Sequence, residues 1–187
     1  MAVITFWSNG KEETAKTLSL AAVATYMSME HNAKVLVLST TYNDNALETC
    51  FWKTDKNDRE TMSSGISNGI EGLSKAIISN KASPEIITNY TKIVFKNRLE
   101  VLPGIKSNNY DEYMHLKQTY PEIIKTANRY YDLIFVDLNK GADDPVTKEI
   151  LDISDLIIVN ITQRLRLIDN YVELRNNGFL KHKINTL

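Results

Sequence analysis

A short polar segment near the amino terminus combines residue types that can bind phosphate and magnesium. It reads SNGKEETAKT over residues 8–17 and is followed by the apolar stretch LSLAAVATYMSM. In such a loop Lys16 can reach the β- and γ-phosphates of a nucleotide, and the Thr17 hydroxyl can bind a magnesium ion. The segment therefore predicts a phosphate site, provided that the elements around it can position these side chains.

A phosphate loop needs a strand before it and a helix after it, because the first turn of a helix offers unpaired N–H groups and a positive dipole end. Short aliphatic runs alternate here with longer segments, which predicts buried parallel strands covered by helices. Strands are expected at residues 3–7, 34–39, 99–102, 133–137 and 156–160. Helices are expected at residues 14–30, 69–80, 84–90, 109–130, 145–153 and 165–176.

This alternation predicts an α/β fold in which a doubly wound, mostly parallel sheet of about five or six strands forms the middle of three layers. Such sheets bind ligands outside the carboxyl ends of their strands. The 187 residues suit one domain, residues 1–187. Residues 53–67 read KTDKNDRETMSSGIS without apolar periodicity, so we expect a long, mobile loop there.

Composition narrows the classes of function. There are 22 basic and 23 acidic side chains with a net charge of -1, so nucleic-acid binding is not implied by charge. Cys50 is the single cysteine, and His31, His115 and His182 are isolated, so neither a disulfide nor a metal cluster is predicted. No basic leader or apolar run of about 18 residues is present, so we expect a cytoplasmic protein without a transmembrane segment.

The polar segment and its flanking strand resemble the ParA/MinD family of deviant Walker A ATPases. The family's loop reads approximately KGGxGK[TS] directly after a strand of the type ITFxS, and residues 4–8 here read ITFWS. The resemblance implies that ATP or ADP and Mg²⁺ are the cofactors, bound weakly or not at all. It also implies catalytic roles for Lys11 and Asp137, and magnesium ligation by Thr17 and Asp137. The implied nucleotide-binding residues are Gly10, Lys11, Thr14, Ala15, Lys16 and Thr17.

Further segments extend the resemblance over nearly the whole chain. YDLIFVD at 131–137 is similar to the family's YDxIxxD strand, whose last residue is the Walker B carboxylate, and residues 139–141 fall at its switch loop. ISDLIIV at 153–159 and LEVLPG at 99–104 also match family segments. The opening TFWS, the segment NDNALET, and LPG followed by a long predicted helix are most similar to divergent ParA-like proteins related to TadZ/CpaE, which localise Tad-type pilus assembly.

Several positions depart from the family pattern. Glu12, Glu13 and Ala15 stand where the family has glycines, and Ser39 and Thr41 replace two acids that order the metal and the attacking water. A like charge at about 4 Å from phosphate costs about 1 kcal/mol in water and about 4 at an effective dielectric of 20. We therefore expect nucleotide binding to be weaker by roughly a hundredfold than with an intact loop.

A simpler interpretation stays open for each motif. The loop can be a turn followed by a helix start, with Thr14 as N-cap or Glu12 and Glu13 as first-turn acids. Asp137 can be a cap at the end of a core strand. The pair Asp143-Asp144 before a proline predicts a helix start, with Asp144 as N-cap.

Three functions follow from these alternatives. The first is a ParA/MinD-like nucleotide-binding domain for partitioning or pilus-assembly localisation, with weak or lost hydrolysis, self-association and protein partners. The second is a protein-interaction scaffold with a vestigial nucleotide site, and the third is an active ATPase with a rearranged loop. Because family members continue past the strand at 156–160 with a further strand and helices, the resemblance also implies a fold shortened at its carboxyl end.

Overall fold

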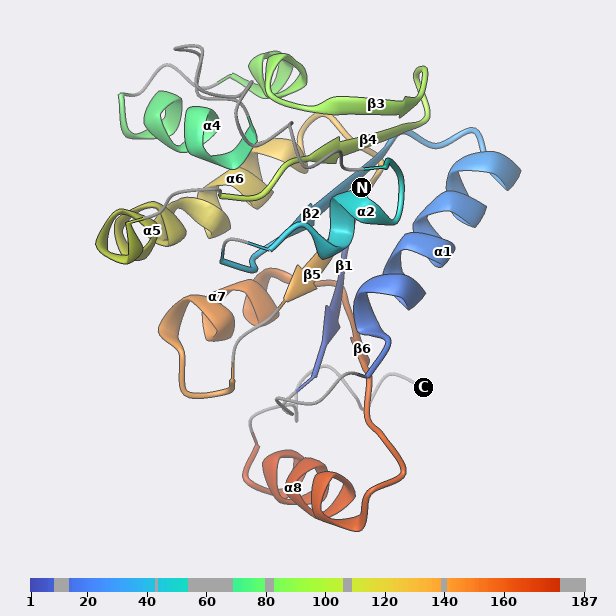
Figure 1. Ribbon diagram of the computed structural model, residues 1–187, viewed down its shortest axis with the longest axis vertical. Helices are drawn as coiled ribbons and strands as arrows, with labels where there is room; N and C mark the ends of the chain where they lie inside the picture. Colours follow the sequence, from blue (N-terminus) through green and yellow to red (C-terminus); the bar gives the residue numbers. More distant parts are fainter. Residues whose placement is uncertain are drawn as a thin grey trace.

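A six-stranded sheet forms the centre of the molecule (Figure 1). The computed structural model describes residues 1–8, 14–42, 44–53, 69–79, 83–105, 109–138 and 141–178. The strand order is β3-β4-β2-β5-β1-β6, in which only β3 runs antiparallel to its neighbour. The bounds are β1 Ala2–Trp7, β2 Val35–Ser39, β3 Lys92–Phe95, β4 Leu99–Leu102, β5 Leu133–Leu138 and β6 Leu156–Val159. The predicted α/β class and the mostly parallel sheet are confirmed.

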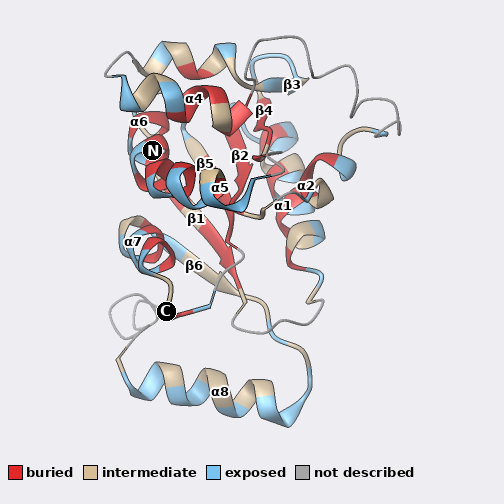
Figure 2. Ribbon diagram, turned by 60° about the vertical axis from the view of Figure 1, so that its left-hand side comes forward, coloured by how far each residue is buried: buried red, intermediate tan, exposed pale blue. Residues whose placement is uncertain are grey.

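Helices cover both faces of this sheet (Figure 1). Helix α1 packs on one face, and α6 and α7 pack on the other. The helical bounds are α1 Lys16–Glu30, α2 Ala46–Thr49, α4 Gly69–Ile78, η1 Pro84–Asn89, α5 Tyr110–Leu116, η2 Lys117–Thr119, α6 Tyr120–Ala127, α7 Pro145–Ile153 and α8 Leu165–Asn176. Helix α8 has no buried residue (Figure 2). Within the described ranges, no helix is both long and apolar enough to cross a bilayer.

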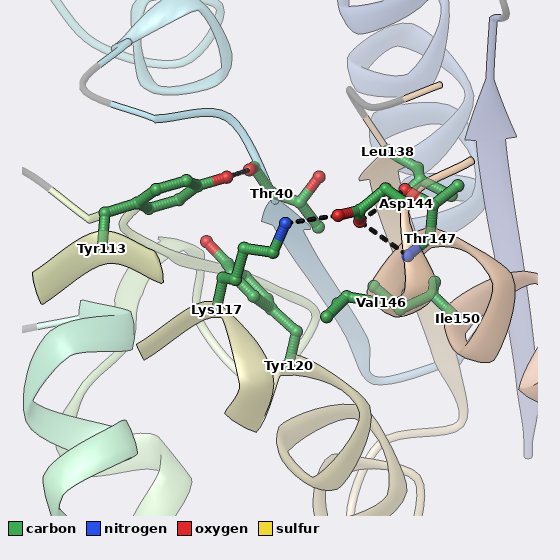
Figure 3. Close-up of a pocket in the computed structure, with 9 residues that line it drawn as sticks. All are labelled: Thr40, Tyr113, Lys117, Tyr120, Leu138, Asp144, Val146, Thr147 and Ile150. Carbon is green, nitrogen blue, oxygen red and sulfur yellow. Dashed lines mark hydrogen bonds and ion pairs between the residues drawn. The ribbon is translucent and has the colours of Figure 1, made fainter. Parts of the chain in front are cut away.

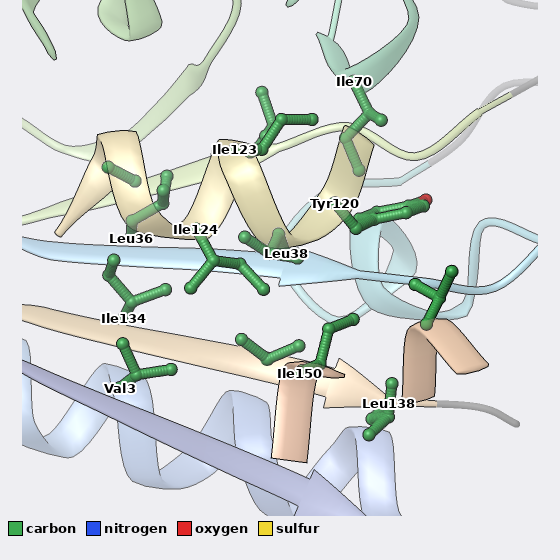
Figure 4. Packing of buried hydrophobic residues seen from close by; sticks show 14 of the residues in the cluster. Val3, Leu36, Leu38, Ile70, Tyr120, Ile123, Ile124, Ile134, Leu138 and Ile150 are labelled. Atoms are coloured by element: carbon green, nitrogen blue, oxygen red, sulfur yellow. The ribbon is translucent and has the colours of Figure 1, made fainter. Parts of the chain in front are cut away.

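The buried strands divide their side chains between two hydrophobic clusters, because successive residues of a strand point to opposite faces. Leu36 and Leu38 of β2 belong to the cluster beneath α6 and α7, together with Tyr120 and Ile150 (Figure 4). The alternate residues of β2, including Val37, belong to the cluster beneath α1. All five residues of β2 are buried, which explains why this central strand reads as one continuous aliphatic run.

Several predicted elements need correction. The single helix expected at 109–130 is three elements, α5, η2 and α6. Pro121 lacks an N–H group and stands at the start of α6, so an α-helical hydrogen bond from it to the Lys117 carbonyl cannot form. The segment expected as a helix at 84–90 is the 3-10 helix η1. Strand β3 and the one-turn helix α2 were not predicted. The loop expected at 53–67 lies outside the described residues, except for Lys53.

The first residue of α4 lies where only glycine fits. Gly69 has φ +70°, and a Cβ there would lie 2.4 Å from the Pro103 carbonyl oxygen. The neighbouring Ile70 N–H donates to the same oxygen at 2.9 Å, so this backbone contact has little room to move. We expect Gly69→Ala to lower the free energy of unfolding by about 2–3 kcal/mol, measured by urea denaturation.

Gly141→Ala is the matched control, because a Cβ at Gly141 would meet no atom within 4 Å. Its effect should stay within about 0.5 kcal/mol. If the two variants were equally stable, the close approach of Gly69 to Pro103 would be wrong.

Candidate functional site

Polar side chains from three elements meet at the carboxyl edge of the sheet. Lys16 and Thr17 begin α1, Ser39 ends β2, and Asp137 lies one residue before the end of β5. The register pairs Ser39 with Asp137 across β2 and β5, and Phe6 with Asp137 across β1 and β5. The carboxyl ends of parallel strands meet at one edge, so residues far apart in sequence come together there, as predicted.

Asp137 is the centre of this cluster and is only 2% exposed. The Thr17 hydroxyl donates to its Oδ2 at 2.8 Å, and the Ser39 hydroxyl donates to the same oxygen at 3.3 Å. The other oxygen, Oδ1, lies 2.8 Å from the Lys16 ammonium. That contact is an ion pair rather than a directed hydrogen bond, since Oδ1 has no hydrogen-bond partner in the described part of the chain. A buried carboxylate is thus balanced by one buried cation.

Lys16 is also held by the backbone of β5. Its Nζ donates to the Leu138 carbonyl oxygen at 2.6 Å, and its side chain is 9% exposed. Both partners of the ammonium therefore lie at the end of β5. An ammonium in this position can turn toward a phosphate only by giving up at least part of these contacts.

Two side chains of this cluster offer ligands that magnesium prefers. Thr17 and Asp137 supply a hydroxyl and a carboxylate within 2.8 Å of each other, and hard cations such as Mg²⁺ take oxygen ligands. Ser39 and Thr41 hydrogen-bond to each other through their hydroxyls at 2.8 Å and add no second carboxylate. The described residues contain no group of three or more His, Cys, Asp or Glu arranged for a metal. Thr17 and Asp137 thus fit an ion that takes its remaining ligands from water or phosphate.

The amino terminus of α1 corrects one expectation. The N-cap is Ala15, not Thr14, and no side chain caps the helix among the described residues. Ala15 adopts the left-handed conformation with φ 51° and ψ 23°. This backbone suits glycine, and a non-glycine residue there costs about 1–2 kcal/mol. Gly10 and Lys11, like Glu12 and Glu13, lie outside the described residues.

Substitution of Ala15 tests this conformation. We expect Ala15→Val to lower the free energy of unfolding by about 1–2 kcal/mol relative to Ala15→Gly, because a β-branched residue is strongly disfavoured at positive φ. Thermal and urea denaturation of the two variants measure the difference. Equal stability would show that residue 15 does not adopt the left-handed conformation.

A second polar cluster borders a small cavity of about 10 Å³, with room for about one water molecule (Figure 3). The Tyr113 hydroxyl donates to the Thr40 carbonyl at 3.1 Å, and the Tyr120 hydroxyl donates to the Ser39 carbonyl at 3.2 Å. Burial, with smaller contributions from Asp144 and Tyr110, raises the pKa of Tyr113 to about 12, so its hydroxyl stays a donor at neutral pH. These tyrosines fix the end of β2 beside Asp137.

Lys117 lies beside the two tyrosines, and its ammonium forms an ion pair with Asp144 on the opposite side of the cavity (Figure 3). Asp144 caps α7 by accepting from the Thr147 N–H at 3.0 Å, which confirms the helix start predicted from the acidic pair. Burial by itself raises the pKa of Asp144, but hydrogen bonds from Lys117 and Thr147 outweigh it and lower the pKa below its ordinary value. Sequence reasoning missed Lys117, which a helix break before Pro121 could have indicated.

Two further polar atoms were also missed. Asn160 Oδ1 and Thr162 Oγ1 are buried without a hydrogen-bond partner in the described part of the chain. The Asn160 N–H donates to the Trp7 carbonyl at 2.8 Å, so both residues follow β6 beside the carboxyl end of β1. Only their position at the carboxyl end of the strand predicted at 156–160 could have identified them. They place unused polar groups on the same edge of the sheet as Asp137.

The sheet order and the flanking helices, with Lys16, Thr17 and Asp137 at the carboxyl edge, match the P-loop NTPase-like α/β fold. Solved structures with the same fold include ParA and MinD ATPases and a plasmid partition protein. The ParA-family ATPase of Chlorobium tepidum gives a TM-score of 0.70 at 19% identity, covering 94% of this chain and 66% of its own. The cell-division ATPase MinD of Pyrococcus furiosus gives 0.68 at 14% identity, covering 98% and 69%. A plasmid partition protein of Borrelia burgdorferi bound to AMPPNP gives 0.63 at 20% identity, covering 97% and 69%.

These similarities confirm the ParA/MinD fold that the sequence motifs predicted. At identities of 14–20%, the similarity shows a shared fold and does not show a shared activity. This chain spans 66–69% of the length of those three proteins. No protein-family model matches it. A stretch of 71 residues is 37% identical to alanine–tRNA ligase of Malacoplasma penetrans, but it covers 36% of this chain and only 8% of the ligase, so it supports no statement about activity.

Proposed function

We propose that this chain is a ParA/MinD-like nucleotide-binding domain that acts in positioning and hydrolyses ATP weakly or not at all. The observation that carries the proposal is the assembly of Lys16, Thr17 and Asp137 at the carboxyl edge of a sheet with the fold of these ATPases. One of the proteins with this fold is bound to AMPPNP and another to Mg-ADP. A lysine, a hydroxyl and a carboxylate in this place can bind phosphate and a cation.

Each proposed site residue has a distinct role. Lys16 donates to the phosphates, and Thr17 and Asp137 are the residues that would hold Mg²⁺, which neutralises phosphate charge when bound. The remaining proposed binding residues are Gly10, Lys11, Thr14 and Ala15, which the resemblance assigns to the phosphate loop. Lys11 is also proposed as a catalytic residue, on the resemblance of its position to the family's signature lysine.

Two features support weak hydrolysis: hydroxyls in place of carboxylates at the end of β2, and two acidic residues in the loop sequence. Ser39 and Thr41 hydrogen-bond to each other, and a hydroxyl is a poor general base for activating water. The sequence adds two negative charges, Glu12 and Glu13, within the loop that would approach the triphosphate. Both features reduce transition-state stabilisation and ATP affinity.

Protein partners and self-association complete the proposal. We propose that the chain acts with the machinery of partitioning or of pilus-assembly localisation, the processes implied by the resemblance. A scaffold with a vestigial nucleotide site is the second candidate. It is favoured by one specific observation, namely that Lys16 already has two partners within the chain.

Calorimetry and phosphate release separate these candidates. Titration with ATP and Mg²⁺ should show binding roughly a hundredfold weaker than that of an intact loop, and Lys16→Ala should remove it. Turnover at the rate of an ordinary ParA-type ATPase would contradict the loss of hydrolysis. Absence of binding to the folded chain at millimolar ATP and ADP would leave the scaffold as the function.

A further inference from the structure

The lysine that should bind phosphate is bound by its own chain. Lys16 Nζ donates to the Leu138 carbonyl at 2.6 Å and lies 2.8 Å from Asp137 Oδ1, and its side chain is 9% exposed. The hydrogen bond to Leu138 uses one of the three N–H donors of the ammonium, and the ion pair holds its positive charge beside Asp137. A phosphate oxygen arriving at Lys16 therefore competes with groups that already hold the ammonium.

The Asp137 carboxylate also has hydrogen-bond and charge partners within the chain, without a metal ion. The hydroxyls of Thr17 and Ser39 donate to Oδ2 at 2.8 and 3.3 Å, and the Lys16 charge lies beside Oδ1. The described residues form no cluster of three or more His, Cys, Asp or Glu, and the end of β2 carries the hydroxyls of Ser39 and Thr41 instead of carboxylates. The buried carboxylate is thus neutralised by Lys16, which stands in for a metal ion.

We propose that Asp137 is an internal competitor for Lys16, and that a phosphate group enters the site by displacing this carboxylate from the ammonium. The proposal deepens the proposed function and rests on the same site. Its ligand class is the phosphate group, either free or carried by a nucleotide. Asp137 then acts against phosphate binding, whereas a carboxylate whose main task is to hold magnesium supports it.

Removing the charge of Asp137 is therefore expected to increase phosphate affinity instead of decreasing it. Asp137→Asn removes a negative charge a few ångströms from the incoming phosphate and releases Lys16, while it keeps the shape of the side chain. Coulomb energies for unit charges at about 4 Å correspond to roughly fivefold in water and several hundredfold at an effective dielectric of 20. Phosphate affinity without magnesium should therefore rise at least fivefold.

Calorimetry of the full chain tests this with two probes, inorganic phosphate and ADP, each in EDTA and in excess Mg²⁺. The matched control is Ser39→Ala, which removes a hydrogen bond to Asp137 but no charge. We expect Asp137→Asn to bind in EDTA at least fivefold more tightly than wild type, and Ser39→Ala to stay within twofold. A response to both probes assigns the site to the phosphate group itself, and a response to ADP alone assigns it to a nucleotide. Equal or weaker binding of both probes by Asp137→Asn would overturn the proposal.

The proposal can still be tested if Asp137→Asn destabilises the fold, because phosphate binding then appears as a gain in stability. Asp137→Asn leaves the buried Lys16 without its counter-ion, so the melting temperature of this variant should rise with phosphate far more than that of wild type. Asp137→Ser serves as a second variant for the same measurement. If both variants stay unfolded even in 50 mM phosphate, the ligand does not replace the carboxylate and the proposal is wrong.

The outcomes also separate this inference from the proposed function. If wild type binds no ATP or ADP while Asp137→Asn binds phosphate, nucleotide binding by the natural chain is wrong and the internal competition stands. If wild type binds ATP with Mg²⁺ while Asp137→Asn binds phosphate and ADP in EDTA no more tightly than wild type, the nucleotide function stands and the internal competition is wrong.

Discussion

Lys16→Met is expected to lower the free energy of unfolding by about 3–5 kcal/mol at neutral pH and to abolish nucleotide binding. The large cost arises because Asp137 is 2% exposed and would lose its cation while remaining in a buried position. Methionine keeps the apolar stem of the side chain, so lost packing contributes little. Urea denaturation measures the stability, and calorimetry with ADP measures the binding.

Two further variants test whether this loss of stability comes from the buried ion pair. Lys75→Met removes a lysine that pairs with Glu71 at 2.8 Å but is 52% exposed, and should cost less than about 0.5 kcal/mol. The double variant Lys16→Met with Asp137→Asn should recover most of the lost stability, since neither charge is then left alone. If Lys16→Met were no more harmful than Lys75→Met, the buried ion pair would be refuted.

Asp144→Asn should give the second large effect, a loss of about 2–4 kcal/mol at neutral pH. Asparagine is as good an N-cap as aspartate, so the loss reports the ion pair with Lys117, whose side chain is 6% exposed. Glu149→Gln is the control, because Glu149 pairs with Lys125 at 3.0 Å where both side chains are about half exposed. The control should stay within about 0.5 kcal/mol.

The same pair predicts a pH dependence. Burial acts to raise the pKa of Asp144, but the hydrogen bonds from Lys117 and Thr147 lower it below its ordinary value. A lowered folded-state pKa contributes stability above the unfolded value of about 3.9, and that stability is lost as the pH falls through the folded-state pKa. Denaturation between pH 7 and pH 2.5 should therefore show a smaller acid slope in Asp144→Asn. An unchanged slope would show that Asp144 is not linked to folding in this way.

The sequence predicted the framework well where burial enforces a simple pattern. Strand β2 is buried at all five positions and reads as a continuous aliphatic run, so its bounds were found to within one residue. Asp144 was found because an acid before Pro145 is a local helix-start signal. Strand β3 reads KIVF and was missed because it has only four residues and, as an edge strand, exposes three of them, so neither the length nor the burial pattern of a core strand identifies it.

Contacts between distant residues explain most of what the sequence could not show. Lys16 and Asp137 were each proposed for the site, yet their pairing depends on the register of β1 with β5 and on the first turn of α1. Lys117 is buried because Pro121 interrupts the helix and turns η2 inward, an effect that helical periodicity alone does not include. The three-dimensional placement, rather than the residue types, therefore determines that Lys16 already has partners.

A crystal structure grown with ADP and magnesium tests the central claim most directly. The account predicts a phosphate group within hydrogen-bonding distance of Lys16 Nζ, with the ammonium moved away from Asp137 Oδ1. At saturating ADP, a Lys16 ammonium that still contacts Asp137 and the Leu138 carbonyl, with no phosphate at the start of α1, would contradict it.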